Sequence, residues 1–120
     1  MRTSARSLLG LVLLVLVVGG ASRWWAGQHK QALGQQVAVL ARAGDIRMIA
    51  SQTCAICVVA RDWMTQNRVA FTECLVERDP VCRADFDAMG APGTPVIVVR
   101  GKPQLGFSPD RLLAALGGAT

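Results

Sequence analysis

The segment DIRMIASQTCAIC, residues 45–57, decides the fold of this chain, because it joins a strand pattern to a pair of cysteines. Residues 45–50 alternate apolar and polar side chains as a short strand does, and residues 58–66 have the Ala, Arg, Trp and Met content of a helix. Cys54 and Cys57 stand between them. Since a Cys-x-x-Cys at a strand-to-helix junction is typical of a reversible dithiol, the segment predicts a redox domain.

Cys54 is the candidate nucleophile of this pair. A helix N-terminus carries unpaired N–H groups and about half a positive charge, which stabilise a thiolate over a thiol. Cys57 follows on the same helical face, so it can attack a mixed disulfide formed at Cys54 and release the reduced partner. The spacing alone also fits half of a zinc site or a permanently oxidised staple.

The residues after the cysteines predict further strands and helices. Residues 69–76 have the β-branched and alternating positions of a strand, which a crossover helix would place parallel to residues 45–50. Asp79 suits the N-cap of a helix that begins with a proline and stops at Gly90. Residues 96–99 are all β-branched and predict a buried strand.

The remaining residues predict an edge strand and a terminal helix. A turn at residues 100–102 would return residues 103–107 antiparallel, and residues 108–110 would start the last helix. The predicted order is therefore βαβ, helix, ββ, helix, which is an α/β fold.

These features resemble the thioredoxin superfamily and, within it, the glutaredoxin branch, in particular the glutaredoxin-like redoxins that serve ribonucleotide reductase. The resemblance covers residues 45–116. It is carried by three motifs: Cys54-Ala55-Ile56-Cys57 after a strand, Thr94-Pro95 before a strand, and Gly106-Phe107-Ser108-Pro109-Asp110 before a helix. It implies a thioredoxin-like fold with a four-stranded mixed sheet (βαβ then ββα). It also implies thiol-disulfide oxidoreductase activity.

The resemblance also implies a substrate site. Pro95 would be the cis-proline that faces the active cysteines, and the backbone of Thr94 would pair with a bound substrate strand. Only about 5 to 6% of X-Pro bonds in folded proteins are cis, so this expectation comes from the family motif alone.

Two departures from the family pattern bear on function. Ala55-Ile56 lacks the proline and the aromatic or histidine common between such cysteines, and residues 51–53 bring no Lys or Arg to lower the pKa of Cys54. Reductant, oxidant and isomerase therefore stay open. Phe107 stands where glutathione-using glutaredoxins have a second glycine, and the Gly-Phe-x-Pro-Asp form resembles redoxins reduced by a flavoprotein. Strong glutathione binding is not expected.

A second cysteine pair is an addition to the pattern. Cys74 falls late in the second predicted strand and Cys82 in the first turn of the next helix. A disulfide between them would close a small loop, with a stabilisation of roughly 2 to 3 kcal/mol in the chain-entropy model. A structural disulfide is favoured, and a second redox pair that relays electrons to Cys54 and Cys57 is the alternative.

The N-terminus has the layout of an export signal. An uncharged apolar run over residues 8–18 follows two arginines and precedes small residues and the pair Trp24-Trp25. We favour an uncleaved anchor over cleavage after Ala21. The domain would then be anchored in the inner membrane and face the periplasm, a compartment in which disulfides persist. The alternative is a secreted periplasmic form.

Composition and charge narrow the function further. Arg2 and Arg6 are two of 13 basic residues, which leaves 11 against 8 acidic ones, and no basic cluster interleaves with aromatics. Nucleic-acid binding is therefore not expected. His29, the single histidine, is interpreted as a solvated surface residue. The predicted organisation is a signal-anchor or signal peptide over 1–25, a helical linker over 26–44 and the redox domain over 45–120, with a helix at 28–42.

The sequence thus predicts an exported, membrane-anchored thiol-disulfide oxidoreductase. Neither a metal nor a bound cofactor is expected, and no flavin or nicotinamide motif is present. The expected partners are protein disulfide or dithiol substrates and a separate redox protein. Two alternatives remain: a zinc module in which Cys54, Cys57, Cys74 and Cys82 supply four thiolates, and a thioredoxin-fold interaction domain without catalysis.

Overall fold

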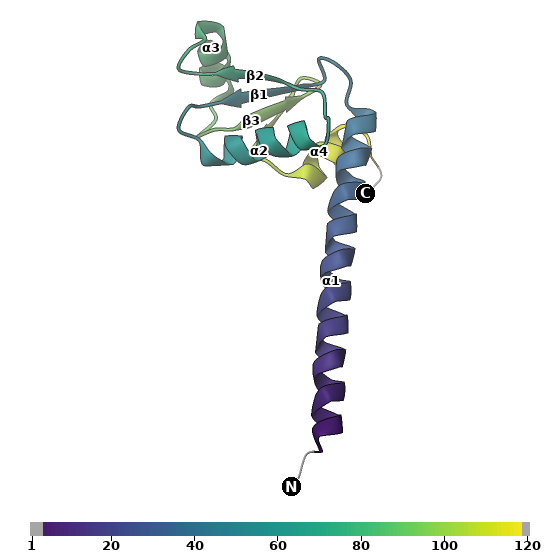
Figure 1. The fold of residues 1–120 in the computed structure, drawn as a ribbon. Helices are drawn as coiled ribbons and strands as arrows, with labels where there is room; N and C mark the ends of the chain where they lie inside the picture. The colour runs from purple at the N-terminus through teal and green to yellow at the C-terminus, as the bar shows by residue number, and fades with distance from the viewer. Residues whose placement is uncertain (1–3, 119–120) are drawn as a thin grey trace. The chain divides into compact units, whose positions relative to one another are not determined.

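A computed structural model describes residues 4–118 of the chain (Figure 1). The elements follow in the order α1 (Ala5–Leu40), β1 (Ile46–Ala50), α2 (Ala55–Gln66), β2 (Thr72–Leu75), α3 (Pro80–Met89), β3 (Val96–Val99), β4 (Lys102–Leu105) and α4 (Pro109–Ala115). The chain divides into two compact units after Ala32. The first unit holds the apolar part of α1, and the second holds the last turns of α1 and every later element.

The four strands form one mixed sheet in the order β2-β1-β3-β4, which confirms the predicted fold class. β1 and β2 run parallel, whereas β3 is antiparallel to both β1 and β4. The parallel pair is joined through α2, which makes these elements a βαβ unit.

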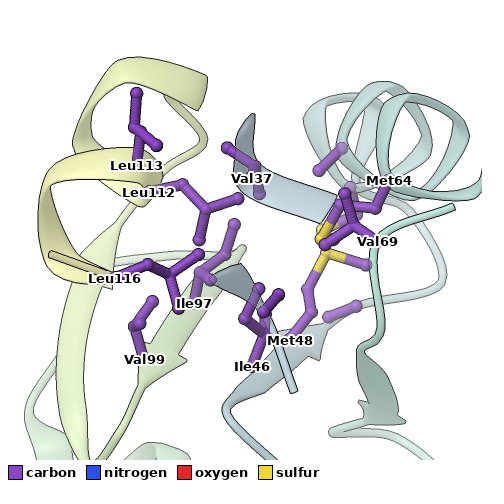
Figure 2. Close-up of a cluster of buried hydrophobic side chains, with 14 residues drawn as sticks. Val37, Ile46, Met48, Met64, Val69, Ile97, Val99, Leu112, Leu113 and Leu116 are labelled. Carbon is purple, nitrogen blue, oxygen red and sulfur yellow. The ribbon is translucent and has the colours of Figure 1, made fainter. Parts of the chain in front are cut away.

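Helices cover both faces of this sheet, α2 and α4 on one and α3 on the other (Figure 1). The larger core lies on the face that α2 and α4 cover, and Figure 2 shows its side chains from β1, β3 and these helices meeting around Val37 of α1. The opposite face has a smaller cluster, formed by Ile49, Val76, Cys82 and Val96.

The last turns of α1 pack with the later elements in the second compact unit. Val37 is fully buried in the larger core and Ala41 is nearly so, while a Cβ on Gly34 would overlap the side-chain amide of Asn67. The compact unit therefore begins at Leu33, before the expected boundary at residue 45. The helix expected at 28–42 is also part of the continuous α1, because no proline or turn motif separates it from the apolar run.

Two strands differ in extent from their prediction. β2 lacks residues 69–71, because the Val69 N–H donates to the carbonyl of Met64 at the end of α2 rather than to a strand. β4 begins at Lys102, since Arg100 and Gly101 both have positive φ and form a two-residue hairpin turn. α3 and β3 match their predicted limits.

Candidate redox site

Three loops converge at one edge of the sheet. β1 and β2 are parallel with Ala50 opposite Leu75, so the segments that follow them lie at the same edge. β3 is antiparallel to β1 with Val96 opposite Ile49, which brings the residues that precede β3 to this edge as well. The sheet therefore gathers residues 51–54, 76–79 and 94–95 in one place.

Cys54 lies at the N-cap of α2 and is joined to Cys57 by a disulfide. The backbone is extended at Cys54 (φ −97°, ψ 106°), and its Sγ accepts a hydrogen bond from the Cys57 N–H at 3.1 Å. Cys57 is fully buried in the larger core, whereas Cys54 is half-buried. An incoming thiol or disulfide thus has access to Cys54 rather than Cys57, and the α2 N-terminus favours the Cys54 thiolate.

Exposed apolar side chains lie beside Cys54 at the start of α2. Ile56, between the two cysteines, is 54% exposed, and Val58 and Val59 on the next turn are exposed as well. These side chains supply neither a proton donor nor a charge, so they can contact a substrate only through apolar surface.

The turn that leads into Cys54 is held by Glu77 from the β2–α3 loop. Ser51 Oγ donates to Glu77 Oε1, and the Gln52 N–H lies 3.2 Å from Glu77 Oε2. The Ser51 hydrogen bond holds the pKa of the Glu77 carboxyl below its usual value. The sequence alone does not reveal Glu77, because the contact crosses 26 residues and no motif marks it.

Thr94 and Pro95 lie directly before β3, and the peptide bond between them is cis. Pro95 is buried and Thr94 is half-buried. The Pro95 carbonyl accepts from the Gly106 N–H at 2.9 Å, which ties the end of β4 to this loop. The structure thus places both residues at the edge of the sheet where the Cys54 loop lies, and their part in substrate binding stays a prediction.

Phe107 follows β4 and packs within the domain. Its ring meets that of Trp63 on α2 edge to face, with 5.6 Å between the ring centroids. The side chain that replaces the expected glycine is therefore fixed against α2 rather than free to swing away.

The second cysteine pair lies on the other face of the sheet. A disulfide joins Cys74 to Cys82, and Cys82 is buried in the smaller cluster beneath α3. Arg47 donates from Nη2 to Cys74 Sγ at 3.5 Å and from Nη1 to Asp85 at 2.8 Å. Because the sheet separates the two pairs, this arrangement argues against one tetrahedral zinc ion held by all four thiolates.

Comparison with known proteins identifies the domain. The glutaredoxin family matches residues 46–103. Among solved structures, a mutant of the thioredoxin-like protein BC3987 is 26% identical, with a TM-score of 0.56 over 63% of this chain and 99% of its own. The glutaredoxin grx-1 from Archaeoglobus fulgidus has a TM-score of 0.51 at 19% identity, over 62% of this chain and 87% of its own, and supports the fold alone.

A search of curated proteins found no match. The family match and the fold agree over the elements that carry Cys54 and Cys57. Residues 46–103 thus match the glutaredoxin family, and the fold around them is thioredoxin-like.

Proposed function

We propose that this protein is a membrane-anchored thiol-disulfide oxidoreductase that exchanges disulfides with protein substrates outside the cytoplasm. The observation that carries the proposal is the asymmetric pair at α2, in which accessible Cys54 is bonded to buried Cys57. The glutaredoxin-like domain around the pair supports a redox function.

In the reductive direction, Cys54 acts first. Its thiolate attacks one sulfur of a substrate disulfide, the substrate S–S bond breaks, and the departing thiolate takes a proton from solvent. Cys57 then loses its proton and attacks Cys54 Sγ, which releases the second substrate sulfur as a thiol. Two electrons have passed from the dithiol to the substrate, and the Cys54–Cys57 disulfide remains. Oxidation of a substrate dithiol follows the same steps in reverse.

A separate redox protein supplies or accepts these two electrons, since the chain has no flavin or nicotinamide motif. The Phe107 ring, packed on Trp63, supports weak use of glutathione, because it occupies the place of a glycine that lets the tripeptide approach. We expect little turnover in a glutathione-coupled disulfide assay, and turnover equal to that of a glutathione-using glutaredoxin would contradict this assignment.

The N-terminal part of α1 supports the membrane location. The helix is long and apolar enough to cross a membrane, and its large apolar side chains from Leu8 to Val18 are each more than half exposed. A signal sequence shares these properties, so the uncleaved anchor is part of the proposal. Arg2 and Arg6 before the run favour a cytoplasmic N-terminus and hence an exported domain.

Trapping tests this function directly. The full-length Cys57→Ala variant, expressed in cells, is expected to accumulate mixed disulfides on Cys54, because the resolving thiol is missing. Dithiothreitol should reduce these mixed disulfides. The double variant Cys54→Ala/Cys57→Ala is the control and should trap nothing. Equal trapping by both variants would mean that Cys54 is not the attacking group. No adduct on either would favour a non-catalytic interaction domain.

A further inference from the structure

The loop between Cys74 and Cys82 packs directly on the turn that carries Cys54. The Val76 N–H donates to the Ala50 carbonyl at 3.0 Å, which extends the β1–β2 pairing to the start of that turn. Within the loop, the N–H groups of Arg78 and Asp79 both donate to the Leu75 carbonyl, so the chain folds back tightly toward α3. The Cys74–Cys82 disulfide closes this segment covalently.

Glu77 lies in this loop and faces the turn. Its carboxylate accepts from the Ser51 hydroxyl and from the Gln52 N–H. Arg78, the next residue, adds a second contact. When the Gln52 side-chain amide is oriented with its oxygen toward Arg78, this oxygen accepts a hydrogen bond from Arg78 Nε at 2.6 Å. Two consecutive loop residues thus hold two consecutive residues of the turn.

Ser51 passes this restraint on to Cys54. The Ser51 carbonyl accepts from the Cys54 N–H at 3.4 Å, and Ser51 Oγ accepts from the Thr53 N–H at 3.4 Å. The position of Cys54 relative to the Cys57 N–H, which donates to its sulfur, therefore depends on how Ser51 is held.

We propose that Glu77 is a positioning residue for thiol-disulfide exchange, which clamps the Ser51–Thr53 turn and thereby aims the Cys54 sulfur at the N–H groups of α2. The second disulfide, on the other face of the sheet, presents Glu77 in the correct place. The inference rests on the proposed role of Cys54 as the nucleophile.

A clamp and a bare charge have opposite effects on Cys54. A carboxylate that acted only through its charge would disfavour the thiolate, so its removal would speed reactions of Cys54. A clamp that keeps the sulfur near the α2 N–H groups favours the thiolate, so its removal would slow them. The hydrogen bond from the Ser51 hydroxyl and, to a smaller extent, the charge of Arg83 lower the pKa of Glu77, so the carboxylate is charged throughout the range in which a thiol titrates.

The experiment measures alkylation of Cys54 by iodoacetamide between pH 4 and pH 9 in the full-length Cys57→Ala background. Cys54 is then the one free thiol, and the Cys74–Cys82 disulfide stays closed. Adding Glu77→Ala is expected to lower the rate at pH 6 roughly three- to tenfold through a raised Cys54 pKa, because one pKa unit is tenfold in thiolate. Glu77→Gln keeps an acceptor oxygen and should stay within about twofold of the parent.

Two further variants keep the test decisive. Ser51→Ala removes the same hydrogen bond from the other partner and should also slow alkylation, which preserves the test if Glu77→Ala does not fold. Asp87→Ala removes an exposed carboxylate of α3 that pairs only with Arg83 among the side chains described, and should leave the rate unchanged.

The outcomes separate the inference from the proposed function. If Cys54 is alkylated in Glu77→Ala and Ser51→Ala as fast as in the Cys57→Ala parent, or faster, Glu77 does not act as a clamp. A parent whose Cys54 titrates like an ordinary cysteine, near pH 8.5, would instead remove the thiolate activation on which the proposed function rests.

Discussion

The two faces of the sheet hold one disulfide each, and they differ in how much apolar packing surrounds the bond. The face that α2 and α4 cover has a large core, which runs from Val37 of α1 to Leu116 (Figure 2). The face that α3 covers has a cluster of four buried residues, one of which is Cys82 itself. Packing thus holds the helices on the first face, whereas α3 has little apolar area to hold it.

This difference assigns a role to each bond. On the well-packed face, we expect reduction of the Cys54–Cys57 bond to leave the structure intact, because the core holds α2 in place. On the other face, the Cys74–Cys82 bond joins α3 to β2, and we expect it to compensate for the smaller apolar cluster. A small domain commonly gains stability from such a covalent link.

The largest effect is expected when the first bond is removed. Cys54→Ala should reduce the full-length protein's reduction of a protein disulfide to the rate of the reductant alone, because no accessible thiol remains at α2. Its thermal midpoint should change little. The assay follows turnover of an oxidised protein substrate, and activity retained by Cys54→Ala would move the reactive group elsewhere.

The second effect, on stability, is expected on the opposite face. Cys74→Ala/Cys82→Ala should lower the free energy of unfolding by roughly 2 to 3 kcal/mol, since the open chain regains loop entropy. Urea denaturation measures this loss, and the variant should keep a reversible Cys54–Cys57 pair. Unchanged stability would refute the role as a brace, and complete loss of turnover would point to electron relay.

A third change weakens the large core without touching either bond. Gly34→Ala should destabilise the domain by roughly 1 to 3 kcal/mol, because the new methyl group overlaps Asn67, whose amide already donates to the Trp63 carbonyl at 2.8 Å. Gly27→Ala is the matched control, since nothing lies within 4 Å of its Cβ. Helix propensity alone favours alanine at both positions. Equal behaviour of the two variants would mean that α1 does not pack on the domain.

The smallest effect concerns pH. The Arg42 N–H and the Arg100 guanidinium lower the pKa of Asp45, so its contribution to stability is complete above the unfolded-state value of 3.8 and is lost as the pH falls through the folded-state value. Asp45→Asn should therefore lower the urea midpoint slightly at pH 7, and the difference should shrink as the pH falls below 3.8. If the difference between the two urea midpoints did not depend on pH, the effect would come from the shape of the Asp45 side chain instead of its charge.

Local chemistry explains what the sequence could predict. α3 begins and ends as expected because Asp79 accepts from the N–H groups of Val81 and Cys82, while Gly90 adopts the left-handed conformation (φ 65°). These signals act within a few residues, so they can be read without the fold. The position of Cys54 at the α2 N-cap follows from the same kind of signal.

Tertiary placement explains what the sequence could not predict. Glu77 contacts Ser51 only because β1 and β2 end at the same edge, and Gly34 contacts Asn67 only because α1 docks beside the end of α2. The face to which each disulfide belongs depends on strand register, with Cys74 opposite Ile49. Each of these contacts joins residues more than 20 positions apart, where no spacing rule applies.

We expect one disulfide to be reversible and the other permanent. A redox titration of the full-length protein in graded glutathione buffers tests it most directly, with quenching by alkylation, peptide mass spectrometry and a record of metal content. We predict that Cys54 and Cys57 interconvert reversibly while Cys74 and Cys82 stay linked throughout. Joint titration of both pairs would mean that neither disulfide is permanent, and four thiolates protected until a chelator removes zinc would mean that the cysteines form a metal site.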